Sequence, residues 1–190
     1  MDTREYRHLD PLHVLGLPDA EVHFLQQYPD RAERNSDTLF VYLRNGTTRT
    51  YTNTALDTER QKKYQFYGLI DGLPYLLITI EEYEDFSISL MHDSTGSEYV
   101  IESRPYLSPD KHHFVTSYNN MVDESFNVTK VWNIDDHAVT LKFEQRISDC
   151  SSVGVEWLTN HTFRYRARYC SSANEDTIEI ANIDGEWRQQ

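Results

Sequence analysis

The feature that most constrains this chain is a long series of short β-prone runs separated by turn residues. In Phe86–Met91 every second residue is apolar, and Thr162–Tyr169 repeats the pattern with Phe163, Tyr165 and Ala167 on one face. Asn45-Gly46 and Asp184-Gly185 are typical two-residue hairpin turns. Alternation with period two, interrupted at short intervals by turns, predicts an all-β fold of antiparallel meanders.

Most of the chain can be divided into such strands. In Tyr75–Glu82, Leu76, Ile78 and Ile80 are expected to share one buried face. The predicted strands are Thr38–Leu43, Thr47–Thr52, Tyr64–Leu69, Tyr75–Glu82, Phe86–Met91, Ser97–Glu102, His113–Tyr118, Ala138–Arg146, Val153–Leu158, Thr162–Tyr169 and Asp176–Ile183.

The N-terminal residues 1–36 lack this pattern and are expected to form an arm. Within the arm, Pro18 and Asp19 suit a helix start, which predicts a short helix over Asp19–Tyr28 before Pro29. Residues 37–190 are predicted to form a single all-β domain. Its blade-like units cover about 64–102, 104–145 and 153–188, and a repeat of about 40–50 residues with four strands is typical of propeller blades.

One stretch carries a family resemblance. Arg104–Asp110 (RPYLSPD), the strand His113–Tyr118 and then Val131–Ile134 (VWNI) resemble a blade of a TolB- or WD40-type β-propeller, with Lys111 at the position of the family's glycine. The span Leu39–Tyr169 also resembles uncharacterised bacterial proteins with one such blade, which implies residence outside the cytoplasm. Three units and a hairpin are fewer than the roughly four blades of a closed propeller. The expected architecture is therefore an open propeller-like stack or a sandwich.

The charge of the chain limits its partners. Eighteen basic residues against thirty-one acidic ones give a formal charge of −13. This balance argues against nucleic acid and anionic membrane surfaces, both of which bind through Lys and Arg. It suits a basic protein partner, and solubility alone is the other explanation of the acidic charge. The longest apolar run, near Leu73–Ile80, is too short to span a membrane. No cofactor is expected.

The two cysteines bear on the cellular compartment. Cys150 and Cys170 each lie ten residues from Asn160, the predicted tip of a hairpin. Opposed residues of an antiparallel pair can form a disulfide, which would stabilise the fold by about 3 kcal/mol. A Cys150–Cys170 bridge indicates a periplasmic or extracellular protein whose export signal was removed. Two buried free thiols and a cytoplasmic protein are the alternative, and MDTREYRHLD at the N-terminus has no apolar core of a signal peptide.

Three alternating arginines are the candidate binding residues. Arg164, Arg166 and Arg168 are expected on one face of a strand, opposite its aromatic residues. Two interpretations are open. The arginines pair across the sheet with glutamates such as Glu156 and Glu179, or they form a stripe that recognises carboxylates or phosphates of a partner.

Other polar groups are interpreted as structural. Adjacent His112 and His113 would point to opposite faces of a strand, so they are not expected to share a metal ion. The groups Glu81, Glu82, Glu84 and Asp85, and Asp135-Asp136-His137, are expected to be solvated turns without a metal. No nucleophile elbow, phosphate-binding glycine loop or zinc-ligand spacing is present, so no catalytic residue is predicted.

These features favour a non-catalytic protein-binding module of the bacterial periplasm or cell surface, of the inhibitor or immunity type. The acidic charge, the thirteen tyrosines and the missing catalytic motifs support it. A module that binds carbohydrate or a small ligand through Trp132, Trp157 or tyrosines is one alternative. A hydrolase with a dispersed active site is another, since a triad is defined by geometry rather than sequence order.

Overall fold

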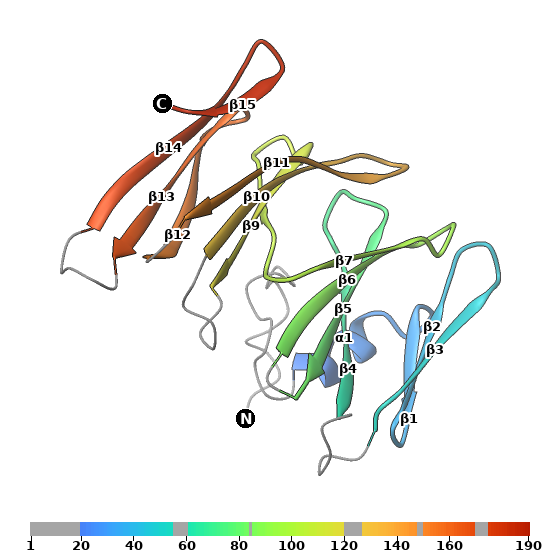
Figure 1. The fold of residues 1–190 in the computed structure, drawn as a ribbon. Coiled ribbons are helices and arrows are strands. Elements are labelled where there is room, and N and C mark those ends of the chain that lie inside the picture. Colours follow the sequence, from blue (N-terminus) through green and yellow to red (C-terminus); the bar gives the residue numbers. More distant parts are fainter. Residues whose placement is uncertain (1–19, 55–60, 84, 120–126, 148–149, 170–174) are drawn as a thin grey trace. The chain divides into compact units, whose positions relative to one another are not determined.

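The protein is an all-β structure with one short helix near the N-terminus of its described part (Figure 1). The computed structural model describes residues 20–54, 61–83, 85–119, 127–147, 150–169 and 175–190. The described strands form four antiparallel sheets, and none of these closes into a barrel. The chain divides into two compact units, Met1–Ile101 and Glu102–Gln190. The predicted fold class is thus confirmed.

The first unit contains a three-stranded sheet, β1-β2-β3, and a four-stranded sheet, β4-β5-β6-β7. Strands that follow one another in sequence are neighbours in each sheet, as expected for meanders. The elements are α1 (Ala20–Gln27), β1 (Ala32–Asn35), β2 (Thr38–Tyr42), β3 (Thr48–Thr52), β4 (Lys62–Leu69), β5 (Tyr75–Glu82), β6 (Asp85–His92) and β7 (Glu98–Ile101).

The second unit contains two four-stranded meanders, β8-β9-β10-β11 and β12-β13-β14-β15. The elements are β8 (Tyr106–Leu107), β9 (His113–Asn119), β10 (Asn127–Ile134), β11 (Val139–Ile147), β12 (Cys150–Thr159), β13 (Thr162–Tyr169), β14 (Glu175–Ile183) and β15 (Glu186–Gln189). The three four-stranded sheets follow the predicted blade-like units closely in extent. Membership of a propeller family stays a prediction.

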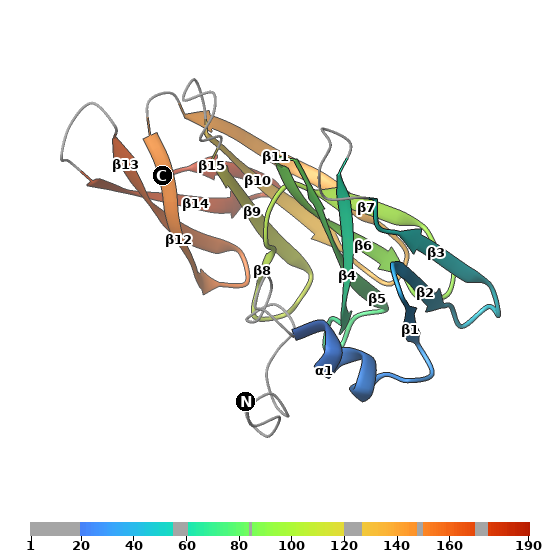
Figure 2. The same ribbon diagram turned by 90° about the horizontal axis from the view of Figure 1, so that it is seen from below.

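Helix α1 matches the predicted helix and packs against β4 (Figure 2). Gly68 of β4 makes this close packing feasible, because a Cβ there would lie 2.6 Å from the ring of Tyr28 and 3.3 Å from that of Phe24. The described part of the predicted arm also contributes β1, which pairs with β2 and was not expected from the sequence. Within the described residues, no helix is both long and apolar enough to cross a membrane.

Two predicted hairpins form with different turns. In the Asp184-Gly185 turn both residues have positive φ, 53° and 90°, as a type I′ turn requires. In the Asn45-Gly46 turn only Gly46 does, at 83°, so the type I′ turn predicted there is wrong. The amide of Gly46 donates to the carbonyl of Leu43 at 3.0 Å, and the amide of Leu43 donates to the carbonyl of Thr47 at 2.9 Å. This is the longer loop that places a glycine after a type I turn.

Strand β5 is buried on both faces rather than on the single face expected. Tyr75, Leu76, Leu77 and Ile78 are all fully buried. Ile80, predicted to lie inward, is only half-buried. A continuous apolar run suits a strand that is covered on both sides, whereas strict alternation suits a half-exposed one.

The two sheets of the second unit face each other across a shared apolar core. From the sheet β8–β11 come Val115 and Val131. The sheet β12–β15 contributes Phe163, Tyr165, Ala167, Ile178, Ile180 and Trp187. One face of the sheet β12–β15 packs on this core, and the opposite face of the same sheet does not contribute to it.

Candidate functional site

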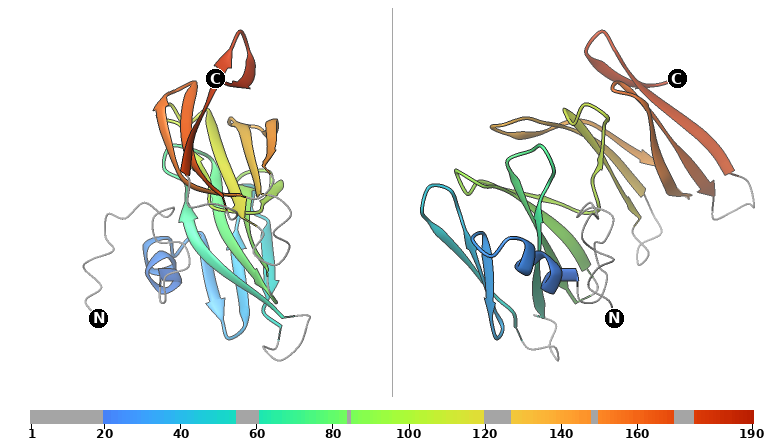
Figure 3. Two further views of the ribbon diagram at one scale, coloured as in Figure 1. Left: turned by 60° about the vertical axis from the view of Figure 1, so that its left-hand side comes forward. Right: turned by 180° about the vertical axis from the view of Figure 1, so that it is seen from behind.

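The predicted arginine stripe lies on the outer face of the sheet β12–β15, drawn in orange to red in Figure 3. Strand β13 is an inner strand of this sheet, between β12 and β14. Its residues Phe163, Tyr165 and Ala167 are buried, whereas Arg164 and Arg166 between them are exposed. The predicted alternation is therefore confirmed for these two arginines. Arg168 lies on β13 as predicted, but its side chain is outside the described part.

Both exposed arginines pair with glutamates of neighbouring strands. Nη2 of Arg164 lies 2.7 Å from Oε2 of Glu156, and its Nε donates to the same oxygen at 2.9 Å. Nη1 of Arg166 lies 3.6 Å from Oε2 of Glu175, which is a looser contact. Glu156 was an expected partner of the stripe and Glu175 was not. Glu179, the other expected partner, is the Cα partner of Arg164 on β14.

Arg166 lies over a glycine at an irregular position of the neighbouring strand β12. Gly154 of β12 has a φ of 68° at a break in the register between Val153 and Glu156, which is the geometry of a β-bulge. A Cβ at Gly154 would lie 3.7 Å from Nη2 of Arg166. The guanidinium thus rests over a residue without a side chain, and the side chain of Arg166 is 58% exposed.

Together Glu156, Arg164, Arg166, Glu175 and Glu179 form what we call the arginine face. Its two arginines and three glutamates nearly balance in charge, although the whole chain carries a formal charge of −13. Two large apolar side chains of the same sheet, Leu158 and Ile183, are 41% and 39% exposed. A sheet face of mixed charge beside exposed apolar groups can bind a protein surface by both polar and apolar contacts.

The predicted disulfide lies partly outside the described residues. The backbone register makes Tyr169 the Cα partner of Cys150, one residue before the predicted partner Cys170. The hairpin loop is Asn160-His161, as expected from the position of its tip. Because residues 170–174 are not described, the bridge between Cys150 and Cys170 stays a prediction.

The turn around Ser108-Pro109-Asp110 is a hydrogen-bonded hairpin between β8 and β9. The Ser108 hydroxyl lies 2.6 Å from Oδ1 of Asp110, and the amide of His113 donates to Oγ of Ser108 at 3.0 Å. Burial alone would raise the pKa of Asp110, but hydrogen bonds from Ser108 and the His112 amide outweigh it and lower that pKa. Asp110 is thus held as a carboxylate that organises the turn.

His113 is packed as an aromatic residue rather than arranged as a metal ligand. Its ring centroid lies 5.3 Å from that of Trp187 and 5.9 Å from that of His161. Burial lowers the pKa of His113, and the attraction of Asp110 opposes this only in part. Within the described part of the chain, no three His, Cys, Asp or Glu residues lie in an arrangement that could hold a metal ion.

The tryptophans considered for sugar stacking contribute to packing in both cases. Trp132 stacks on Phe114 with centroids 5.8 Å apart, and its Nε1 donates to Oγ1 of Thr116 at 2.9 Å. Trp157 packs against the core of the second unit, and its Nε1 donates to the carbonyl of Tyr106 at 2.8 Å.

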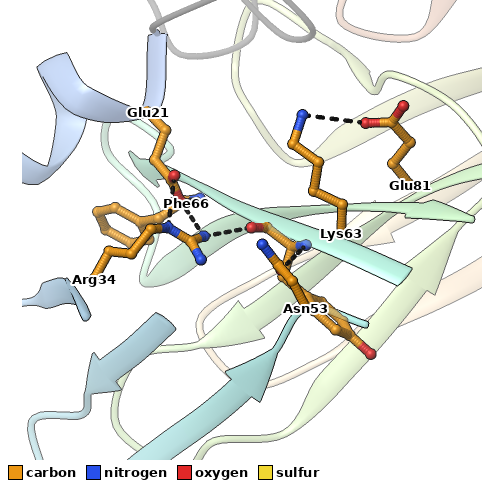
Figure 4. Close-up of polar contacts among 7 residues, drawn as sticks. Glu21, Arg34, Asn53, Lys63, Phe66 and Glu81 are labelled. Atoms are coloured by element: carbon orange, nitrogen blue, oxygen red, sulfur yellow. Dashed lines mark hydrogen bonds and ion pairs between the residues drawn. The ribbon is translucent and has the colours of Figure 1, made fainter. Parts of the chain in front are cut away.

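The two acidic groups differ, because Asp135 closes a turn as expected, whereas Glu81 and Glu82 lie on strand β5 and pair with lysines of β4. Glu81 pairs with Lys63 at 3.5 Å (Figure 4), and Glu82 pairs with Lys62. Oδ1 of Asp135 accepts from the amides of His137 and Ala138 at 2.8 and 2.9 Å, which closes a turn. Glu84 lies outside the described residues.

A buried ion pair in the first unit was not expected from the sequence. Glu21 of α1 receives two hydrogen bonds from Arg34 of β1, at 2.8 and 2.6 Å, and one from the amide of Phe66 at 2.9 Å (Figure 4). This network joins α1 to two sheets. The only available signal was a glutamate in the first turn of a short amphipathic helix, which usually indicates exposure.

Comparisons with known proteins give no identification. No family model matches the chain, and no curated protein matches it.

Proposed function

We propose that the protein is a non-catalytic protein-binding module and that its partner docks on the arginine face. Arg166 carries this proposal. It is exposed, lies over Gly154, and within the described residues its ion pair with Glu175 is a loose contact of 3.6 Å. Its guanidinium can therefore exchange that contact for a bidentate bond to a partner's carboxylate at little cost.

The surroundings of Arg166 support a protein partner over a small ligand. The arginine face offers charged groups from three neighbouring strands, β12, β13 and β14. Leu158 and Ile183 add apolar surface to the same sheet. The acidic charge of the remaining chain favours a partner with a basic surface around its docking site.

The type of binder that we propose is an inhibitor or immunity-type protein of a bacterial periplasm or cell surface. The blade-like sequence around Ser108-Pro109-Asp110 and the predicted Cys150–Cys170 bridge support this location.

Affinity capture with three baits tests the proposal. The baits are the wild type, Arg166→Glu and the matched control Arg146→Glu, since Arg146 is an exposed, glutamate-paired arginine of β11. We expect one protein to be retained in stoichiometric amount by the wild type and by the control, and to be lost from Arg166→Glu. The melting temperatures of all three should agree within about 2 °C, because exposed pairs contribute little.

Two outcomes would contradict the proposal. One is that no stoichiometric protein is captured by the wild type. The other is that Arg166→Glu retains the same protein as the wild type, or melts several degrees lower, which would assign Arg166 to cross-strand pairing.

A further inference from the structure

Three arginines from separate segments gather at the turn between β6 and β7. Arg31 directly precedes β1, Arg44 lies in the β2–β3 loop, and Arg49 is on β3. Each contacts the turn His92–Ser97, through Asp93 or Gly96. We call these residues the turn arginine cluster.

Asp93 positions two of the three guanidinium groups. Its side chain is fully buried, and its Oδ2 lies 3.2 Å from Nη2 of Arg31 and 2.9 Å from Nε of Arg44. Its Oδ1 accepts from the Ser94 hydroxyl at 2.9 Å. One carboxylate oxygen is thus shared by two cations, so Asp93 cannot neutralise both.

Arg44 and Arg49 extend the cluster toward solvent. The side chain of Arg44 is 64% exposed and uses Nε for Asp93, and a guanidinium has further N–H donors. Nη2 of Arg49 donates to the carbonyl of Gly96 at 3.2 Å, which is a neutral group. Gly96 allows this approach, because a Cβ there would lie 2.7 Å from Cδ1 of Leu43 and 3.3 Å from Nε of Arg49.

The cluster is a local concentration of positive charge in an acidic chain. Among the described residues, Asp93 contacts Arg31 and Arg44, and Glu98 is bonded to the hydroxyl of Tyr51. Three guanidinium groups thus gather at one turn of a chain whose formal charge is −13. The buried carboxylate of Asp93 fixes the exposed Arg44, and such an arrangement pre-orients the remaining guanidinium donors for an anion.

From this geometry we propose that the turn arginine cluster binds a phosphate group, either as free phosphate or as part of a phosphate monoester. Arg44 and Arg49 donate to the phosphate oxygens, and Arg31 with Asp93 holds Arg44 in place. This site lies in the first unit and does not depend on the arginine face.

Titration with inorganic phosphate, followed by two-dimensional amide NMR at constant ionic strength, tests the proposal. We expect saturable shifts at the amides of Ser94–Ser97, and an apparent affinity that falls about tenfold or more in Arg44→Gln and in Arg49→Gln. Arg49→Gln leaves both contacts of Asp93 intact, so it remains informative if Arg44→Gln is poorly folded. Arg146→Gln, on β11, is the matched control and should bind like the wild type.

Two further titrations define the ligand. Phenyl phosphate should cause the same shifts if the site accepts monoesters, and no shifts if it accepts only free phosphate. Acetate should bind at least about tenfold more weakly than phosphate, because it offers fewer oxygens and less charge. Absence of saturation by phosphate, equal affinity for acetate, or unchanged affinity in both glutamine variants would overturn the proposal.

Discussion

Lys111 adopts a backbone conformation that glycine adopts more readily. Its φ is 61°, in the left-handed region, and its amide donates to the carbonyl of Ser108 at 2.9 Å. A residue with a Cβ is strained there by about 1 kcal/mol. A glycine at this position would adopt the same φ without that strain.

Lys111→Gly is expected to stabilise the protein. Relief of the left-handed strain exceeds the added entropy of the unfolded chain, so the free energy of unfolding should rise by about 0.5 kcal/mol. Urea denaturation monitored by circular dichroism measures this change. The control Thr140→Gly, at an exposed position of β11 that is paired with Asn133 of β10, should lower the free energy of unfolding instead. A loss of stability in Lys111→Gly would show that the lysine side chain itself contributes more than the strain costs.

At the scale of single elements, local pattern was enough to predict most strands. Turn residues and alternation placed the hairpins of β2–β3, β12–β13 and β14–β15 correctly. The exact turn geometry was not determined by the Asn-Gly pair, because a glycine with positive φ serves both the short and the longer loop. The second buried face of β5 depends on what covers it, which alternation cannot describe.

The candidate sites also differ in how much of each could be predicted from the sequence. The exposed face of Arg164 and Arg166 follows from period-two alternation, and the partner Glu156 follows from the hairpin register. The cluster around Asp93 could not be predicted, because its arginines come from segments that lie far from residue 93 in the sequence. The pair of Glu21 and Arg34 was missed for the same reason, since only tertiary packing buries it.

The packing of His113 between the sheets β8–β11 and β12–β15 should make stability depend on pH. Burial lowers the pKa of His113, so the unfolded chain, with a pKa near 6.5, binds the proton more readily. Stability is then fully present above about pH 6.5 and decreases as the pH falls toward the lowered pKa. Besides Asp110, the charged groups around the ring are His112, Lys142 and His161.

Replacement of His113 by phenylalanine tests this dependence. The variant keeps an aromatic ring against Trp187 but cannot take up a proton. Between pH 7.5 and about 5.5, the melting temperature of the wild type should fall more steeply than that of His113→Phe. Parallel curves would show that His113 does not contribute to the acid sensitivity.

For the molecule as a whole, net charge outweighs individual surface pairs. At a formal charge of −13, the excess negative side chains repel one another in the folded state and lower its stability. Exposed ion pairs such as Arg188–Glu186 contribute little to stability. Raising sodium chloride from about 20 to 300 mM shortens the Debye length to less than 10 Å. We therefore expect the melting temperature to rise by a few degrees, as measured by calorimetry. A decrease would mean that attractive pairs dominate the electrostatics.

Each sheet is made only of strands that follow one another directly in the chain. No strand must wait for a partner synthesised much later, so a sheet can form once its last strand has left the ribosome. Synthesis would then complete the sheets one after another, in the order in which their strands occur in the chain. The register of β12 is set within its own hairpin with β13. A misaligned strand of the last sheet can therefore change its register while the earlier sheets stay folded.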